Sequence, residues 1–123
     1  MAKKILFIED ESALQKAATQ VLSETGYEVS SALDGETGLR VAKELLPDLI
    51  LLDLILPKKN GFEVLKELKE NEQTKKIPVI ILSNLESGGD VQKSLELGAT
   101  TYLVKTNYSL QDVVEKIKGI LGE

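Results

Sequence analysis

Short apolar runs alternate along the chain with longer segments in which apolar residues recur every three or four positions. Short runs of this kind are typical of buried strands, and the longer pattern is typical of amphipathic helices. Their regular alternation indicates parallel strands joined by crossover helices. The sequence therefore predicts an α/β fold of five successive βα units. The expected strands are Lys4–Ile8, Glu28–Ala32, Leu49–Leu52, 79–82 and Thr101–Val104.

Polar residues and glycines mark where several of the helices should begin and end. Ser12, Asp34 and Ser109 stand at the start of three helical patterns, and their side chains can accept hydrogen bonds from the first free amides of a helix. Gly26 and Gly98 follow the first and fourth patterns, where a left-handed residue commonly ends a helix. These signals predict helix boundaries to within a few residues.

The helical segments each present one apolar face, which we expect to pack on the sheet. The third and fourth helices are expected over 60–71 and 90–97. The residues expected on the buried faces are Leu14, Ala18, Val21, Leu22, Leu39, Ala42, Leu46, Phe62, Leu65, Leu68, Leu110, Val113, Val114, Ile117, Ile120 and Leu121.

Composition narrows the chemistry that the chain can support. It has 123 residues, 42% of them hydrophobic, which is enough for the core of one domain, and we expect a single domain over 1–123 with no second domain. Cysteine and histidine are both absent, so a disulfide, a Ser-His-Asp triad and a conventional zinc site are excluded. The net charge of −5 and the lack of a basic run argue against direct nucleic-acid binding. No apolar stretch approaches the roughly 20 residues of a membrane span, and we expect a cytoplasmic protein.

Charged and hydroxyl side chains follow four of the five expected strands. Because parallel strands all end at one edge of a sheet, these side chains should lie close together. Clustered carboxylates repel one another unless a hard cation such as Mg²⁺ lies between them, and a carboxylate can also accept a phosphoryl group. The residues concerned are Glu9, Asp10 and Glu11 after the first strand, Asp53 after the third, Ser83 after the fourth and Lys105 after the fifth.

These features resemble the receiver domains of bacterial two-component response regulators, including the chemotaxis-type proteins that consist of a receiver alone. The resemblance covers the whole chain. It implies a flavodoxin-like three-layer sandwich with strand order 2-1-3-4-5, acting as a signalling switch and not as an enzyme. It rests on Glu9-Asp10-Glu11, the segment 53–61 (DLILPKKNG), Ser83 and the run Tyr102-Leu103-Val104-Lys105.

The resemblance also implies a role for each site residue. Asp53 would accept a phosphoryl group from a histidine kinase or phosphotransfer protein. Glu9, Asp10, Asp53 and the backbone carbonyl of Ile55 would hold Mg²⁺, with Glu9 acting directly or through water. Ser83 and Lys105 would contact phosphoryl oxygens, and Ser83 and Tyr102 would form the switch. The fourth helix, fifth strand and fifth helix would present the result to a downstream protein in trans.

Other functions remain open on the residues alone. An Asp after a strand is more often a turn or helix cap, and a Tyr on a strand more often packs than switches. The chain could also be a receiver-like docking module that needs no phosphorylation, although such a module need not retain Asp10, Asp53 and Lys105. A dehalogenase-like phosphatase would need Asp-x-Asp after the first strand, where this chain has Glu-Asp-Glu.

The chain departs from the usual receiver pattern in three places. Thr106 stands where most receivers have a cis proline, and a cis bond before another residue costs about 2.5–4 kcal/mol, so we expect a trans bond or visible strain. Ile55 and Leu85 stand where rapidly dephosphorylated receivers have polar side chains, which predicts slow dephosphorylation. Gly88 and Gly89 are expected just before the fourth helix, in a segment that moves on activation.

Overall fold

Five parallel strands form one sheet in the order β2-β1-β3-β4-β5 in the computed structural model, which describes residues 2–84 and 88–122. The strands are β1 (Lys4–Ile8), β2 (Glu28–Ala32), β3 (Leu49–Leu52), β4 (Val79–Ser83) and β5 (Thr101–Val104). The helices are α1 (Ser12–Glu24), α2 (Gly35–Leu45), α3 (Gly61–Glu70), α4 (Gly88–Glu96) and α5 (Leu110–Leu121), and the short 3-10 helix η1 (Lys105–Asn107) follows β5.

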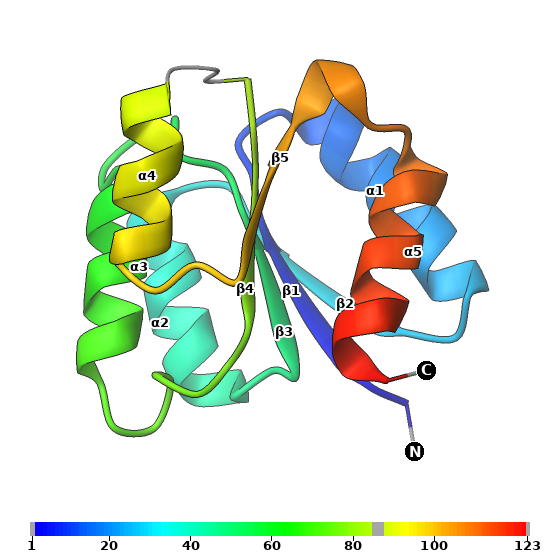
Figure 1. The fold of residues 1–123 in the computed structure, drawn as a ribbon. Helices are drawn as coiled ribbons and strands as arrows, with labels where there is room; N and C mark the ends of the chain where they lie inside the picture. The colour runs from blue at the N-terminus through cyan, green and yellow to red at the C-terminus, as the bar shows by residue number, and fades with distance from the viewer. Residues whose placement is uncertain (1, 85–87, 123) are drawn as a thin grey trace.

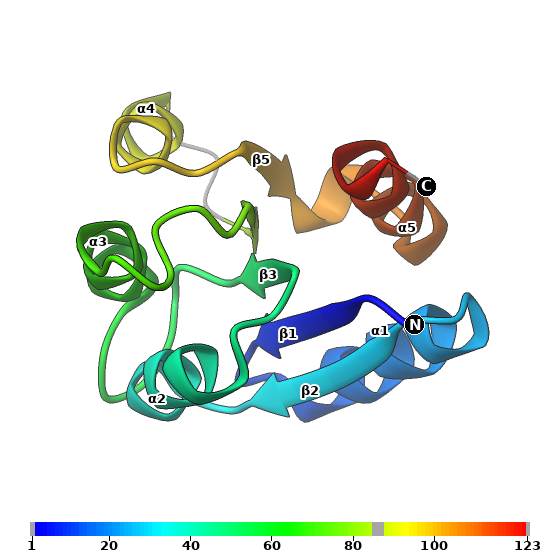
Figure 2. The same ribbon diagram turned by 90° about the horizontal axis from the view of Figure 1, so that it is seen from below.

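The helices cover both faces of the sheet. Helices α1 and α5 lie on one face, and α2, α3 and α4 lie on the other, as the two views in Figures 1 and 2 show. Each crossover helix therefore buries its apolar stripe against strands that are themselves covered on both sides. The α/β, flavodoxin-like three-layer fold and the strand order predicted from the sequence are confirmed.

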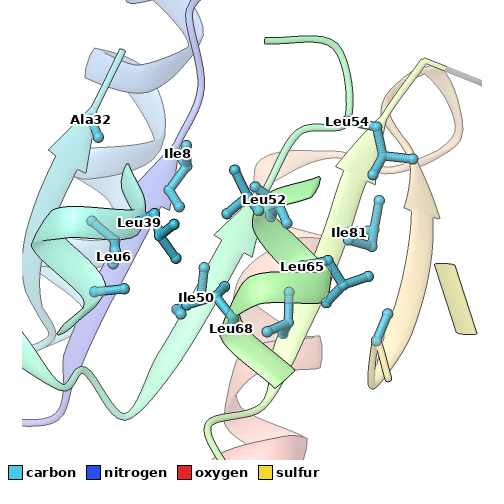
Figure 3. Close-up of a cluster of buried hydrophobic side chains, with 14 residues drawn as sticks. Leu6, Ile8, Ala32, Leu39, Ile50, Leu52, Leu54, Leu65, Leu68 and Ile81 are labelled. Atoms are coloured by element: carbon cyan, nitrogen blue, oxygen red, sulfur yellow. The ribbon is translucent and has the colours of Figure 1, made fainter. Parts of the chain in front are cut away.

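The central strands β1 and β3 supply side chains to two separate cores. Along β1, Leu6 and Ile8 face α2 and α3, whereas Ile5 and Phe7 face α1 and α5, and all four are fully buried. Figure 3 shows the first of these cores, where Leu6 and Ile8 lie with Leu65 and other side chains from α2, α3 and β3. Because both faces are covered, these strands are apolar throughout and show no alternation with polar residues.

Strands β1, β2 and β3 end level with one another at one edge of the sheet, and β4 and β5 continue two residues further. Ile8 pairs with Ala32 on one side and with Leu52 on the other, and Leu52 pairs in turn with Ile81. The residue that follows β1 and the residue that follows β3 therefore leave the sheet side by side. This register, set by pairing across the sheet, determines which polar side chains can meet.

Two of the three expected N-caps form as the sequence predicts. The Asp34 carboxylate accepts a hydrogen bond from the Thr37 amide at 2.8 Å. Ser109 Oγ accepts from the Asp112 amide at 3.1 Å, and the Asp112 carboxylate accepts from the Ser109 amide at 3.0 Å, which completes a capping box. Such caps depend only on residues three positions apart, which is why they are readable from the sequence.

The prediction that Ser12 caps α1 was wrong. Ser12 is the first helical residue, and Glu11 occupies the N-cap position because its carbonyl accepts the first helical bond, from the Gln15 amide. No side chain among the described residues caps this helix end. Two acidic side chains of the turn before α1, those of Glu9 and Asp10, lie beside Asp53 instead of capping the helix.

Several details near the helix ends also differ from the prediction. Leu46 is 46% exposed and adopts the left-handed conformation just after α2, so its side chain turns away from the core. Phe62 is only half-buried and lies beneath the Lys93 ammonium, 4.4 Å from the ring centroid.

Gly88 and Gly89 belong to the first turn of α4, because that helix begins two residues earlier than predicted. The motion proposed for this segment stays a prediction.

Candidate functional site

Glu9 and Asp53 lie one residue beyond the paired strands, and the backbone pairing continues far enough to hold both. The Glu9 amide donates to the Ala32 carbonyl at 3.0 Å, and the Asp53 amide donates to the Ile8 carbonyl at 3.1 Å. The backbone at the base of each side chain is thus part of the sheet. A carboxylate mounted in this way has fewer conformations to lose when a ligand binds.

Three carboxylates meet at this edge of the sheet. Glu9, Asp10 and Asp53 each offer an oxygen within 4.8 Å of the other two. Glu9 is fully buried and Asp53 is 4% exposed, whereas Asp10 is exposed, so the cluster opens to solvent on the Asp10 side. Glu11 is exposed and takes part only through its amide, which donates to Glu9 Oε2 at 3.1 Å.

Lys105 is the cation that lies among these carboxylates. Its Nζ is 2.6 Å from Glu9 Oε1 and 3.1 Å from Asp53 Oδ2, so one ammonium joins the ends of three strands. Burial alone would lower the pKa of Lys105, but the hydrogen bond with Glu9 and the charge of Asp53 outweigh it and raise that pKa above its usual value. Lys105 therefore remains charged and offsets part of the repulsion in the cluster.

Glu9 has a strongly shifted ionisation. The pKa of Glu9 is raised from an ordinary 4.5 to about 7, chiefly by burial and also by the charge of Asp53, while the hydrogen bond with Lys105 opposes the shift. Near neutral pH, neither the ionised nor the protonated form of Glu9 is thus strongly favoured. A second cation beside the carboxylates would restore the ionised form.

The donor set fits a hard divalent cation. Carboxylate oxygens are the preferred ligands of Mg²⁺. Glu9 Oε1 is buried, and it shares the Lys105 ammonium, 2.6 Å away, with Asp53. Exposed acidic clusters are common without a metal, whereas two of these three carboxylates are buried, and a second cation would favour the ionised form of Glu9.

The Asp53 side chain is oriented by contacts to both of its oxygens. Oδ1 accepts a hydrogen bond from the Ile55 amide at 3.2 Å, while Oδ2 faces Lys105. The backbone of Ile55 is therefore beside the cluster, and its side chain is 56% exposed. The loop that runs from Asp53 to Gly61 returns to its own start at Gly61. A Cβ on Gly61 would lie 2.4 Å from the Asp53 carbonyl oxygen, so this close approach requires glycine.

The same loop is also held from the side by α2. A Cβ on Gly35 would lie 1.8 Å from the carbonyl oxygen of Lys59, so the first turn of α2 packs directly on the loop backbone. Lys59 forms an ion pair with Glu67 of α3, which fixes the other end of the same segment. The loop that orients Asp53 is thus bounded by two helices.

Ser83 and Tyr102 lie together on the neighbouring strands. Ser83 is the fully buried last residue of β4 and pairs with Val104, the residue before Lys105. Tyr102 is half-buried against the α3 side of the core. Burial raises the pKa of Tyr102, and a side-chain hydrogen bond with Ser83 opposes that shift, so the two hydroxyls are in contact.

The structure brings together the residues that the sequence placed in the site. The peptide bond between Lys105 and Thr106 is trans, as predicted, and both residues belong to η1. Leu85, on which part of the dephosphorylation prediction depends, lies outside the described residues. The positions are observed, and the chemical roles of the residues stay predictions.

Sequence reasoning missed Gln15. Its side chain is 9% exposed, and its Nε2 donates to the carbonyl of Glu9 at 3.1 Å and to that of Ala32 at 3.0 Å. The signal was present in the sequence, because Gln15 precedes Ala18 by three positions and Leu22 by seven and so lies on the buried stripe of α1. A polar residue on such a stripe requires a buried partner.

Comparison with known proteins identifies the family. The model of the response regulator receiver domain matches residues 5–118, so the chain belongs to the response regulator receiver domains of two-component systems. The transcriptional regulatory protein CiaR from Streptococcus pneumoniae is 43% identical over 118 residues, which is 96% of this chain and 51% of CiaR. The chain spans between 23% and 52% of the length of curated relatives of this kind.

Solved structures agree with this assignment. A CheY-like receiver domain protein from Methanospirillum hungatei JF-1 superposes with a TM-score of 0.93 at 30% identity, covering 99% of this chain and 95% of that one. The Mn²⁺-bound form of the response regulator Rcp1 superposes with a TM-score of 0.81 at 37% identity, covering 96% and 91%. A divalent metal is thus present in a similar receiver. Within 2–84 and 88–122, no helix has the length and apolar character needed to cross a membrane.

Proposed function

We propose that this receiver domain is a phosphorylation switch in which Asp53 accepts a phosphoryl group from a histidine kinase or a phosphotransfer protein. The observation that carries the proposal is the arrangement around Asp53. A buried carboxylate stands beside a second buried carboxylate and a lysine, with a third carboxylate at the open side. Such a group of charges is costly to bury and is typical of a site that handles a metal and a phosphoryl group.

In the proposed reaction, one carboxylate oxygen of Asp53 attacks the phosphorus of a phosphohistidine. A P–O bond forms, the P–N bond breaks, and the electron pair stays on the imidazole nitrogen. The Ile55 amide holds Asp53 Oδ1 and thereby orients the carboxylate for attack. The Lys105 ammonium, now shared by Glu9 and Asp53, is close enough to pair with a phosphoryl oxygen after transfer.

The side chains of Glu9, Asp10 and Asp53 and the carbonyl of Ile55 would hold Mg²⁺ in this site. When bound, Mg²⁺ supplies positive charge that offsets the charge of the transferred group. Glu9 and Asp53 are mounted on sheet backbone and so present their oxygens without a large loss of conformational freedom. Lys105 and the metal then share the negative charge that Lys105 alone offsets in the free protein.

The switch would run through the hydroxyls of Ser83 and Tyr102. Ser83 pairs with Val104, the residue before Lys105, at the sheet edge and can turn its hydroxyl toward a phosphoryl oxygen. That movement would break its hydrogen bond with Tyr102 and change the position of the ring on β5. A downstream protein would read the change on the surface of α4, β5 and α5, where Leu95 and Tyr108 expose large apolar side chains.

A docking module that works without phosphorylation is the alternative. It requires no convergence of Asp10, Asp53 and Lys105, whereas these three residues come from three separate strand ends and meet around one point. The convergence favours the phosphorylation switch. A fold that served only for docking would also gain stability by replacing the buried charges with apolar residues.

The test is incubation with Mg²⁺ and acetyl phosphate, followed by intact mass. We expect the wild-type protein to gain one phosphoryl group and Asp53→Ala to gain none. Asp48→Asn is the matched control, because Asp48 stands immediately before β3, at the other end of the strand that Asp53 follows, and its carboxylate accepts from the Lys4 amide at 2.7 Å, far from the cluster. The control should gain the group as the wild type does.

Three outcomes would count against the proposal. They are no gain in the wild type, an equal gain in Asp53→Ala, or a gain that is unchanged when EDTA replaces Mg²⁺. Circular dichroism of each variant would show that the loss in Asp53→Ala does not come from unfolding.

A further inference from the structure

Gln15 bridges the ends of two strands from inside the first turn of α1. Its amide nitrogen carries two hydrogens, and the two carbonyls that it contacts, those of Glu9 and Ala32, lie 3.1 Å and 3.0 Å away. Both hydrogens of Nε2 are therefore used. Gln15 is only 9% exposed, so water competes little for these bonds.

The carbonyl of Glu9 belongs to the peptide bond that joins the two acidic residues of the cluster. A peptide unit is planar, so holding its oxygen fixes the rotation about the Cα–C bond of Glu9 and thereby the position of the Asp10 Cα. The Glu9 amide is already bonded to Ala32, which leaves this peptide as the next free rotation along the chain. Gln15 therefore fixes where the Asp10 Cα, which carries the acidic side chain, lies relative to Glu9.

We infer that Gln15 is a positioning residue for the divalent metal, acting through the Glu9–Asp10 peptide. This inference rests on the proposed function, because it assumes that the three carboxylates bind Mg²⁺. The three oxygens lie within 4.8 Å of one another with this peptide held by Gln15, and Glu9 and Asp10 flank the peptide on either side, so a change in its orientation moves one carboxylate relative to the other. Without the amide of Gln15, the free protein samples other orientations, and part of the binding free energy is spent on restoring the one that binds.

The simpler role for Gln15 is to attach α1 to the sheet. In that case its loss would destabilise the folded protein by the same amount with and without metal, and the affinity for Mg²⁺ would not change. A positioning role predicts a loss of affinity in addition to any loss of stability. The two roles are therefore separated by measuring affinity and stability on the same variants.

The experiment compares Gln15→Met with the wild type and with Gln20→Met. Methionine keeps the length and helix propensity of glutamine but cannot donate a hydrogen bond. Gln20 is on the same helix, and its amide contacts only the exposed Glu24 side chain at 3.2 Å among the described residues, so Gln20→Met removes a glutamine without touching the site. Calorimetric titration with MgCl₂ gives the affinity, and urea unfolding in EDTA gives the stability of the metal-free protein.

We expect Gln15→Met to bind Mg²⁺ about tenfold more weakly than the wild type, which is the change that corresponds to ordering the backbone of roughly one residue. Gln20→Met should bind as the wild type does. The Asp10 amide resonance should also broaden or shift in metal-free Gln15→Met and return toward its wild-type position when Mg²⁺ is saturating.

A second variant keeps the inference open to refutation if Gln15→Met does not fold. Gln15→Asn retains the amide but draws it back by one methylene, so it should also lower the affinity. Affinity within twofold of the wild type in the folded variant, or an equal loss in Gln20→Met, would overturn the inference about Gln15. Absence of Mg²⁺ binding by the wild type would instead overturn the proposed function, and the inference with it.

Discussion

The ionisation of Glu9 leads to a test of the electrostatics of the whole site. The perturbation is Glu9→Gln, which keeps the shape of the side chain and removes its titration. Glu9 is fully buried, and its pKa is raised to about 7 by burial and by Asp53, with Lys105 opposing. The wild-type protein and the variant should therefore respond differently to pH over the interval from about 4.5 to 7.

The sign follows from the direction of the shift. An acid whose pKa is higher in the folded state than in the unfolded state binds more protons when folded, so the free energy of unfolding falls as the pH rises between the two values. Each unit of pKa corresponds to about 1.4 kcal/mol. From about pH 5 to about pH 8, Glu9 should thus cost the metal-free wild type about 2–3 kcal/mol of stability. Glu9→Gln has no such loss.

The assay is urea unfolding followed by circular dichroism, in EDTA, at both pH values for both proteins. The change in the free energy of unfolding between the two pH values is compared between the wild type and Glu9→Gln. This comparison removes the contributions of other titrating groups. Asp34, for example, has a pKa lowered by its hydrogen bond with Thr37, so its stabilising effect is lost only in more acidic solution, below its ordinary value of 3.8. Adding MgCl₂ should stabilise the wild type more near pH 8 than near pH 5, because metal binding requires the ionised carboxylate.

Two results would refute this reasoning. One is a metal-free wild type and a Glu9→Gln variant that change in parallel between the two pH values. The other is an Mg²⁺ stabilisation of the wild type that is as large near pH 5 as near pH 8. Either would mean that Glu9 is ionised throughout and that burial does not govern its charge.

Three further predictions follow from the same contacts. Lys105→Met removes the cation from two buried carboxylates and should destabilise the metal-free protein by about 3–5 kcal/mol near pH 8. Part of this loss should be recovered in MgCl₂, and equal losses with and without metal in urea unfolding would contradict the prediction. Gly35→Ala forces a methyl group onto the Lys59 carbonyl and should cost about 1–3 kcal/mol by the same assay, whereas Gly119→Ala, where nothing lies within 4 Å, should be neutral or stabilising. The exposed Ile55 side chain cannot orient water, so the acyl phosphate should decay slowly after removal of acetyl phosphate; a half-life of seconds would be the contrary result.

The fold was largely predictable from the sequence because its signals are local. The apolar runs of β1 and β3 are continuous, which indicates strands covered on both faces, and the intervening helices carry their own period. Asp34 and Ser109 were readable as caps because the bonds that they accept come from three residues away. The misplaced residues lie at the ends of elements, such as Ser83 at the end of β4, Gly88 at the start of α4 and the cap of α1.

Exposure at the ends of helices was not predictable in the same way. Leu46 continues the apolar spacing of α2, yet the helix stops before it, and its left-handed backbone turns the side chain outward. Phe62 also fits the spacing of α3, but its burial depends on how closely α4 approaches, and Lys93 covers only part of the ring. Periodicity describes one helix at a time, whereas burial depends on its neighbours.

The sequence by itself determined which chemical groups stand at the ends of the strands, because each follows its own strand directly. Only the tertiary structure decided that Lys105 reaches an aspartate 52 residues earlier in the chain, that Glu9 is fully buried, and that Gln15 holds the peptide between Glu9 and Asp10. The physical reason is that distances and burial arise from pairing between strands that are far apart in sequence. The charge state of the site depends on that burial more than on the residue types present.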